Sequence, residues 1–379
     1  ICKQDENICL DIEDLKLNDN VIGFNTEIQK ISIENITYTQ PYLEKECIKI
    51  TTNTGRSIEC SEDHPIYSLL KRKRFENTFD FKEAGILNLN DKICVPDIIN
   101  IFGKDKIEDA RLIGLLIGDG SYGYDQSISF HTDDDSLKDF IENNYNYTKR
   151  FIRIGKNNLE FVEYTIKEKR NLLREIGIID QVKLNKRLPV NIQKCDKETI
   201  CELLGGYYDA DGYVNIRNTF NNTRKVAEIT LTSIVYEIII EVQHLLHRLG
   251  IHSRIRKRLP RINKKGIKDV NPWYELIIAD SKSLVRFSNN IKLLVKHKQE
   301  RLDEIKNVFS KIKRNSRDEN IRLEKIIKIE KTGVKQVYNF TANTTNTYLG
   351  NGIITHNTEG GSFEGSEKLF YNTAAYEIF

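Results

Sequence analysis

Apolar and polar residues alternate over short stretches in the first hundred positions, which predicts β-strands separated by turns. The clearest pair is residues 47–52 and 57–61, joined by a turn at 53–56. Two alternating runs on either side of such a turn are typical of a β-hairpin. Further short runs at 8–12 and 21–25 extend the pattern. The first hundred residues are therefore expected to form an all-β module.

The middle of the chain changes to a helical period, and the change occurs twice. Residues 110–117 and 203–210 are apolar at helical spacing, and in each case an alternating segment and then another helical segment follow. The last of these segments, 234–249, ends before Gly250, a residue that commonly terminates helices. A repeated order of helix, strands and helix indicates a diverged internal duplication.

Alternation returns near the end of the chain, after a charged stretch at 313–319. Strands are expected at 325–330, 334–341 and 347–349, with a turn at 350–352. A chain of 379 residues exceeds the size at which one hydrophobic core usually keeps growing. The pattern therefore predicts a multidomain protein in which an α+β region interrupts an all-β one.

Composition narrows the class of protein. Hydrophobic residues make up 39% of the chain and charged residues 30%, which is typical of a globular protein. No apolar run of membrane-spanning length and no signal segment occurs, so we expect a cytoplasmic protein with no membrane partner. The 7 cysteines lack C-x-x-C spacing, which favours reduced thiols over zinc. Methionine is absent, so the chain is expected to be an internal piece of a longer product.

Each helical run that opens a copy of the duplication ends in a carboxylate followed by glycine. The first reads Leu-Ile-Gly-Leu-Leu-Ile-Gly-Asp-Gly at 112–120, and the second reads Leu-Gly-Gly-Tyr-Tyr-Asp-Ala-Asp-Gly at 204–212. Small residues recur every four positions in both, so the two helices can pack with close backbones and set Asp119 beside Asp211. Two facing carboxylates repel unless a cation neutralises them. Hard oxygen ligands prefer Mg²⁺, which activates water in phosphodiester hydrolysis.

Basic residues are concentrated in one stretch, although the net charge is only +3. They are Arg254, Arg256, Lys257, Arg258, Arg261, Lys264, Lys265 and Lys268. Such a cluster can follow the phosphates of double-stranded DNA, while side chains on the strands after each helix would read bases in the major groove. A solvated surface is the alternative interpretation of any charge run.

The two nonamers resemble the LAGLIDADG motif of homing endonucleases, and the resemblance extends over about 108–311. It implies an α+β domain with pseudo-two-fold αββαββα repeats that cuts double-stranded DNA with Mg²⁺ held by Asp119 and Asp211. Lys186 precedes the second motif and Lys298 lies in a later family-like segment, so the resemblance makes both candidate active-site lysines. A solvated surface lysine is the alternative for each.

Near the end of the chain, His356, Asn357 and Thr358 follow one another directly. The side-chain nitrogen of an Asn can attack its own carbonyl, which closes a succinimide and cuts the chain after that residue. The preceding His can polarise the carbonyl, and the following hydroxyl can accept an acyl group. Upstream, Ser61-Glu62-Asp63-His64 follows a predicted strand.

Together these segments resemble an intein, a protein-splicing element with the all-β Hint (horseshoe) fold and no cofactor requirement. By this resemblance Cys2 is the first nucleophile, Ser61 and His64 belong to the motif that activates the upstream bond, and His356 and Asn357 complete the reaction at Thr358. The resemblance implies splicing segments at 1–105 and 316–357, an endonuclease at 106–315 and a downstream host segment at 358–379, with Ile1 as the last upstream host residue. The chain departs from the family pattern at two places. The residues after Cys2 are more polar than usual, and Asn346 stands where the family often carries His.

The sequence therefore favours a monomeric intein with an inserted homing endonuclease, from a bacterium or a phage-infected cell. Its partners would be the intein-free DNA insertion site and the flanking host segments. The stretch 358–365 with 370–372 resembles a phage terminase large subunit. Three alternatives stay open, namely a DNA-binding module with an inactive nuclease, a free-standing homing endonuclease, and a Hedgehog-type self-processing domain. Asn357 argues against the last, and the final His-Asn-Thr argues against the second.

Overall fold

The structure is a computed structural model that describes residues 12–72, 77–123, 127–154, 159–178, 181, 183–219, 224–260, 271–311, 320–357 and 374–375. The chain divides into two units with separate hydrophobic cores. Unit 1 contains the residues up to Ile101 and those from Arg314 onward, and unit 2 is Phe102–Lys313. None of the helices in the described part of the chain has the length and apolar character that a bilayer crossing requires.

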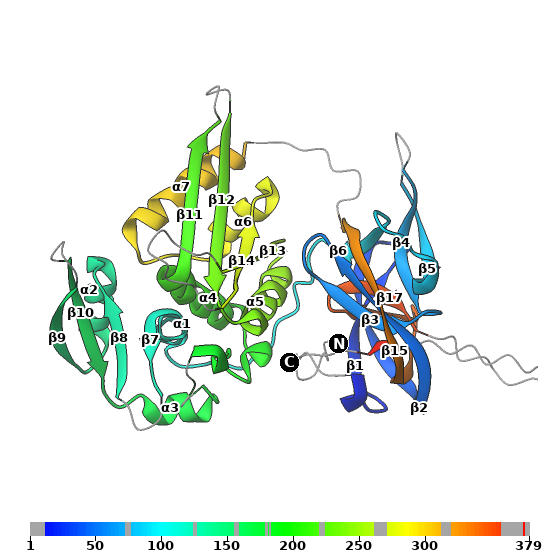
Figure 1. The fold of residues 1–379 in the computed structure, drawn as a ribbon, viewed down its shortest axis with the longest axis horizontal. Coiled ribbons are helices and arrows are strands. Elements are labelled where there is room, and N and C mark those ends of the chain that lie inside the picture. Colours follow the sequence, from blue (N-terminus) through cyan, green and yellow to red (C-terminus); the bar gives the residue numbers. More distant parts are fainter. Residues whose placement is uncertain are drawn as a thin grey trace, which may run out of the picture. The chain divides into compact units, whose positions relative to one another are not determined.

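Unit 1 is built from β-strands (Figure 1). Its strands pair in the order β16-β17-β4-β6-β15-β2-β3-β18, while β1 pairs with β2 and β5 with β4. The bounds are β1 Asn20–Asn25, β2 Lys30–Thr52, β3 Ser57–Ser61, β4 Pro65–Arg72, β5 Asn77–Glu83, β6 Lys92–Pro96, β15 Ile321–Ala342, β16 Thr347–Gly350, β17 Ile353–His356 and β18 Ala374–Ala375.

The long strands β2 and β15 run antiparallel and join the two ends of unit 1. The sequence predicts two strands at 325–330 and 334–341, whereas the structure has one strand with register shifts. One shift lies between Lys331 and Gly333, and Gly333 has a φ of +83°, which glycine adopts at little cost. The strand expected at 8–12 differs as well, because Ile12–Asp14 form a 3₁₀ turn, and positions 8–11 lie outside the described residues.

The predicted hairpin at 47–61 is confirmed, with Cys47 opposite Ser61 and Thr51 opposite Ser57. Its turn carries a buried ion pair, because Arg56 Nε donates to Glu324 Oε1 of β15 at 3.1 Å. Arg56 also donates through Nη1 to the carbonyl oxygen of Asn351, just before β17. A buried charge is retained only when it is paired and hydrogen-bonded. This pair therefore fastens the early hairpin to the last strands of the unit.

Unit 2 consists of two halves with the same order of helices and strands, as the duplication predicts, except that the second half ends in an additional helix, α7. Each half pairs its strands into an antiparallel sheet, β7-β8-β10-β9 in the first and β11-β12-β14-β13 in the second. The first half contains α1 Ala110–Asp119, β7 Gly120–Ser121, β8 Ile128–Thr132, α2 Asp135–Asn144, β9 Tyr147–Ile154, β10 Leu159–Ile166 and α3 Arg170–Glu175. The second contains α4 Lys197–Asp211, β11 Gly212–Asn218, β12 Lys225–Ser233, α5 Tyr236–Arg248, β13 Arg254–Arg258, β14 Trp273–Ile278, α6 Ser281–Asn290 and α7 Lys296–Phe309.

Helices α1 and α4 pack against each other with their backbones almost in contact. A Cβ placed on Gly114 would lie 2.1 Å from the Leu203 carbonyl oxygen, and one on Gly206 would lie 2.1 Å from the Arg111 carbonyl oxygen. Only glycine fits at these two crossings, because a methyl group at that distance would force the helices apart. The small-residue spacing in the two nonamers therefore serves this contact.

Replacing Gly206 with Ala is expected to lower the free energy of unfolding of unit 2 by about 1–3 kcal/mol, because the methyl group overlaps the backbone of α1. Urea denaturation followed by the fluorescence of the single tryptophan, Trp273 on β14, measures this unit. Glu198→Ala, at a side chain that is 82% exposed in the same helix, is the matched control. Equal midpoints for the two variants would contradict the packing argument.

Candidate active sites of the two units

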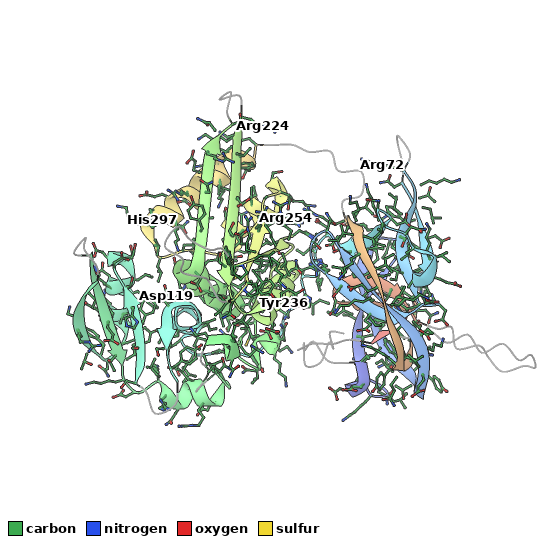
Figure 2. All side chains as sticks on the ribbon, viewed as in Figure 1. Arg72, Asp119, Arg224, Tyr236, Arg254 and His297 are labelled. Atoms are coloured by element: carbon green, nitrogen blue, oxygen red, sulfur yellow. The ribbon has the colours of Figure 1, made fainter. Side chains whose placement is uncertain are left out.

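The two acids of the repeated motif lie at the ends of the two touching helices. Helix α1 ends at Asp119 and α4 ends at Asp211, because Gly120 and Gly212 adopt extended backbone and begin the next strands. A Cβ on Gly118 would lie 2.4 Å from Ala210 Cβ and 3.3 Å from Asp211 Oδ2. The Asp211 carboxylate therefore lies against the end of α1, where Asp119 is placed (Figure 2).

Each of these helix ends also receives one lysine. Lys186 Nζ donates to the carbonyl oxygens of Ile117 at 2.9 Å, Gly118 at 3.2 Å and Gly120 at 3.1 Å. Lys298 Nζ donates to those of Tyr208 at 3.1 Å and Asp209 at 2.7 Å. The last carbonyls of a helix lack intrahelical partners and carry the negative end of its dipole, which favours a cation. The two candidate lysines thus occupy equivalent positions in the two halves.

The site is electrostatically crowded. Burial, reinforced by the neighbouring Asp119 carboxylate, raises the pKa of Asp211 from 3.8 to about 7. Burial also raises the pKa of Asp119, although the charges of Lys186 and Lys298 act in the opposite direction. Burial lowers the pKa of both lysines, against the attraction of the acids. Two carboxylates that resist ionisation side by side are a donor set suited to a hard divalent cation.

The protein would supply only part of such a coordination sphere. Within the described residues, no group of three or more His, Cys, Asp or Glu side chains is arranged to hold a metal ion. Asp119 and Asp211 are therefore the residues that could bind one, with water or a phosphate oxygen completing the shell, as is usual for Mg²⁺.

Sequence reasoning missed a second acid in the α4 motif. The buried Asp209 accepts backbone hydrogen bonds from Leu294 at 2.9 Å and Val295 at 3.0 Å, and it pairs with Arg111 of α1 at 3.2 Å. These bonds fix the segment that leads into α7 and so place Lys298. The only signal was a difference between the copies, since the first motif has Ile117 at the corresponding position.

The basic stretch falls on β13, the edge strand of the second sheet, where Figure 2 labels Arg254. Ile255 packs against the core of unit 2, so the alternate residues Arg254, Arg256 and Arg258 face away from it. Arg256 and Arg258 both pair with Glu275 of β14, at 3.5 Å and 2.9 Å, which offsets part of the positive charge. Of the remaining candidates, Lys257 is on β13, and the others lie outside the described residues, namely Arg261, Lys264, Lys265 and Lys268.

The first sheet presents a polar hollow on the corresponding face. Ile128 and Phe130 of β8 pack into the core, so Ser129 and His131 point the other way. Glu163 of β10 lies opposite His131 and pairs with it at 3.3 Å. The hollow is lined by Ser121, Ser127, Ser129, His131, Thr148, Lys149, Arg150, Glu163 and Thr165.

In unit 1, His64 occupies the turn between β3 and β4. The turn is closed by its backbone N–H, which donates to the Ser61 carbonyl oxygen at 3.1 Å. The side chain is fully buried, and burial, together with the charge of His356, lowers the pKa of His64 to about 3. Its Nε2 lies 3.5 Å from the Tyr348 hydroxyl, and its Nδ1 has no hydrogen-bond partner among the described residues. His64 is therefore a neutral imidazole at physiological pH.

Strand β17, which ends at His356, brings Asn357 to the same sheet. Strand β17 pairs with β4, with Thr355 opposite Ile66. Asn357 is 2% exposed, and neither polar atom of its side chain has a partner among the described residues. His356 Nδ1 forms a hydrogen bond with the carbonyl oxygen of Asn357. This carbonyl belongs to the peptide bond that the sequence predicts to be cleaved. His64 and Asn357 thus belong to one body, whereas Cys2 and Thr358 lie outside the described residues.

Residues 198–292 match the family model of the LAGLIDADG-like domain. This stretch is therefore similar to the LAGLIDADG-like domain family. It covers α4, with Asp211 and its glycines, through α6. The predicted fold class, an all-β unit interrupted by an α+β unit of two repeated halves, is also what the strand order and element order give.

Curated relatives match most of this chain but little of their own length. The replication factor C small subunit of Methanocaldococcus jannaschii is 25% identical over 84% of this chain and 16% of its own. The ribonucleoside-diphosphate reductase NrdEB subunit alpha of Bacillus subtilis is 26% identical over 83% and 30%. A DNA polymerase of Thermococcus litoralis is 26% identical over 66% and 14%. The chain spans less than a third of the length of these proteins.

Among solved structures, an Ssp DnaB mini-intein variant aligns with 92% of this chain and 87% of its own, at 9% identity and a TM-score of 0.30. The LAGLIDADG homing endonuclease I-GzeII, solved with its DNA target, aligns with 54% of this chain and 90% of its own, at 10% identity and a TM-score of 0.34.

Replacing Asp211 with Asn is expected to stabilise unit 2, and more so at pH 8 than at pH 5. The folded protein keeps a proton on Asp211 up to about pH 7, whereas the unfolded chain releases it near 3.8, so the wild type loses stability as pH rises through that window. Asn does not ionise and avoids this loss, which is on the order of 4 kcal/mol above pH 7.

Urea midpoints from Trp273 fluorescence in EDTA at the two pH values test this. Asp139→Asn, at an exposed carboxylate of α2, is the control and is expected to show no such pH dependence. A pH-independent effect of Asp211→Asn would refute the crowding of the two acids.

Proposed function

We propose that this chain is an intein that splices itself out of a host protein and carries a DNA-cutting homing endonuclease in its interior. The observation that carries the proposal is the pairing of β4 with β17, which puts the buried His64 and the buried Asn357 into one sheet although unit 2 separates them in sequence. By the resemblance these two residues act at opposite ends of the spliced segment, so they must meet in one body.

The relatives support an inserted element. A replication factor C subunit, a ribonucleoside-diphosphate reductase subunit and a DNA polymerase differ in name and function, yet they match 84%, 83% and 66% of this chain. In each of them the matching part is a minor share of the whole protein. A segment common to unrelated enzymes is expected of an element that moves between host genes, and homing is the means of such movement.

Splicing would begin at Cys2. Its sulfur attacks the carbonyl carbon of Ile1, and the Cys2 nitrogen leaves as an amine, which gives a thioester. The hydroxyl oxygen of Thr358 then takes over the acyl group and releases the thiol. A neutral imidazole such as that of His64 can donate from one ring nitrogen and accept at the other, which suits the exchange of the first proton.

The second cleavage would take place at Asn357. Its side-chain nitrogen attacks its own carbonyl carbon, the peptide bond to Thr358 breaks, and the proton lost by the amide goes to the departing amine. The His356 contact to the carbonyl oxygen supports this step, since an N–H there stabilises the negative charge that develops on that oxygen. The freed ester then rearranges to a peptide bond between the host segments.

DNA cleavage would take place at the ends of α1 and α4. Asp119 and Asp211 would hold a divalent cation such as Mg²⁺, which supplies activated water and stabilises the leaving oxygen of a phosphodiester. The ammonium groups of Lys186 and Lys298 offset the negative charge that builds up on the phosphate. The outward faces of the two sheets, with Arg254 on one and His131 on the other, would contact the duplex and read its bases.

Replacing Asn357 with Ala in a precursor with both host segments is expected to abolish release of residues 358–379, because alanine has no side-chain nitrogen to attack the carbonyl. Mass spectrometry of the purified precursor over time measures the release. A downstream fragment released at the wild-type rate would reject the splicing proposal.

Asp119→Asn is expected to reduce cutting of a plasmid that carries the host gene without the coding sequence for 2–357 by at least about a hundredfold, because it removes one of two cation ligands. The reaction contains Mg²⁺, and gels separate supercoiled, nicked and linear DNA. Asp139→Asn is the matched control and keeps wild-type cutting. Binding of this plasmid by the wild type without any cutting would favour the DNA-binding module instead.

A further inference from the structure

We infer that Glu34, a buried carboxylate on β2, is a positioning residue for the cyclisation of Asn357. The inference rests on the proposed splicing function and concerns a residue that sequence reasoning did not single out. Glu34 is 0% exposed, and its carboxylate hydrogen-bonds with Thr345 and not with either reacting group. It acts through the loop that precedes β16.

The side chain of Glu34 lies between β1 and β16, in space that a glycine on β1 leaves open. On β1, Gly23 lies two residues beyond Val21, the residue directly opposite Glu34. A Cβ on Gly23 would lie 2.6 Å from Glu34 Cγ and 2.7 Å from the Thr347 carbonyl oxygen. Any other residue would block the path, so the glycine makes room for the carboxylate.

Both carboxylate oxygens of Glu34 are used on Thr345. The backbone N–H of Thr345 donates to Oε2 at 3.0 Å, and its hydroxyl donates to Oε1 at 2.6 Å. A buried carboxylate is stable only where such donors compensate for its lost hydration. The Thr345 hydroxyl also lies 2.9 Å from the hydroxyl of Thr347, which in turn hydrogen-bonds with the Phe24 N–H at 2.8 Å and the Phe24 carbonyl oxygen at 3.0 Å.

Thr345 lies between two residues in unfavourable backbone conformations. Thr344 has a φ of +76° and Asn346 a φ of +54°, the left-handed region that non-glycine residues seldom adopt. Each such residue costs on the order of 1 kcal/mol and persists only where surrounding contacts fix it. The two hydrogen bonds to Glu34 help to hold this loop in place, together with the contact between Thr345 and Thr347 and the backbone bonds of Asn343.

The strained loop has a direct contact with the scissile end. The carbonyl oxygen of Asn346 accepts the backbone N–H of Asn357 at 2.8 Å. Asn346 stands where the resembling family often carries His, and here its main-chain oxygen meets the reacting residue. Glu34, Thr345, Asn346 and Asn357 thus form a continuous chain of hydrogen bonds and one peptide link.

Orientation limits the rate of a cyclisation of this kind. The Asn357 side chain has no polar partner among the described residues, so its direction is set by its own backbone. That backbone is held at the N–H by Asn346 and at the carbonyl by His356. Release of the loop would let the Asn357 N–H turn away, and small misplacements of reacting groups cost one to two orders of magnitude in rate.

The test isolates cyclisation from the acyl transfers. In a full-length precursor carrying Cys2→Ala, cleavage after Asn357 is the remaining route to release of 358–379. Adding Glu34→Gln to this precursor is expected to slow the release about tenfold or more, because the amide replaces one acceptor of Glu34 with a donor. Glu330→Gln, at an exposed carboxylate of β15, is the matched control and leaves the release unchanged.

A second precursor separates positioning from general damage to the fold. With Asn357→Ala and an intact Cys2, an added thiol cleaves the upstream thioester and reports the first step alone. Glu34→Gln is expected to change this upstream cleavage by less than about twofold, while Thr345→Val, which keeps the acid, slows only the release of 358–379. Melting curves of all variants accompany the rates.

Equal release from the Cys2→Ala precursor with and without Glu34→Gln would overturn the inference. So would a parallel fall in upstream cleavage and downstream release, since that is the signature of a purely structural role. Failure of the Cys2→Ala precursor to release 358–379 at all would instead remove the splicing proposal, and the inference with it.

Discussion

The antiparallel pairing of β2 with β15 is the contact on which the rest of unit 1 depends, because it closes a single core from two stretches of chain that the whole of unit 2 separates. Its backbone hydrogen bonds are supplemented by the buried pair of Arg56 and Glu324. Once the two stretches are joined, β4 and β17 can pair, and His64 and Asn357 are brought to the same sheet. When a large domain is inserted in a chain, the two flanking stretches form one folded unit only if the strand pairing between them is stable.

Unit 2 solves a related problem by a different interaction. Its two halves meet where α1 and α4 cross with almost no side-chain volume between them, and this closeness is what crowds Asp119 and Asp211. The crowding is unfavourable for the empty protein and favourable for a bound divalent cation. Lys186 and Lys298 use the carbonyls exposed at the same helix ends, so each half provides one acid and one cation by the same local geometry.

The two units place their reactive groups by opposite electrostatic means. In unit 2, acids lie partly open at helix ends and wait for a counter-charge. In unit 1, burial leaves His64 neutral and the Asn357 amide without polar partners among the described residues. A neutral amide nucleophile and a neutral imidazole suit acyl chemistry, while paired carboxylates suit phosphodiester hydrolysis. The buried neutral groups of unit 1 thus suit the proposed splicing, and the crowded acids of unit 2 suit the proposed DNA cleavage.

Local sequence determined the pieces of this protein that depend on near neighbours. The hairpin at 47–61, the two glycine-ended helices and the order of the repeated elements follow from alternation, helical spacing and turn residues, which act over a few positions. The acids of the motif were found for the same reason, because their position is fixed by the helix that carries them. The single length of β15 was not predicted, since its continuity depends on pairing with β2 and not on its own pattern.

Tertiary structure alone decided which distant residues meet. Three contacts join positions that are tens to hundreds of residues apart. Asp209 fixes the segment before Lys298, Glu275 pairs with the arginines of β13, and Glu34 supports the loop at Asn346. Sequence periodicity does not predict such contacts, because the pattern around a carboxylate on a strand is the same whether it faces water or a strained loop. Short motifs in the sequence predicted the candidate residues of the two sites. The contacts that position those residues depend on the tertiary structure.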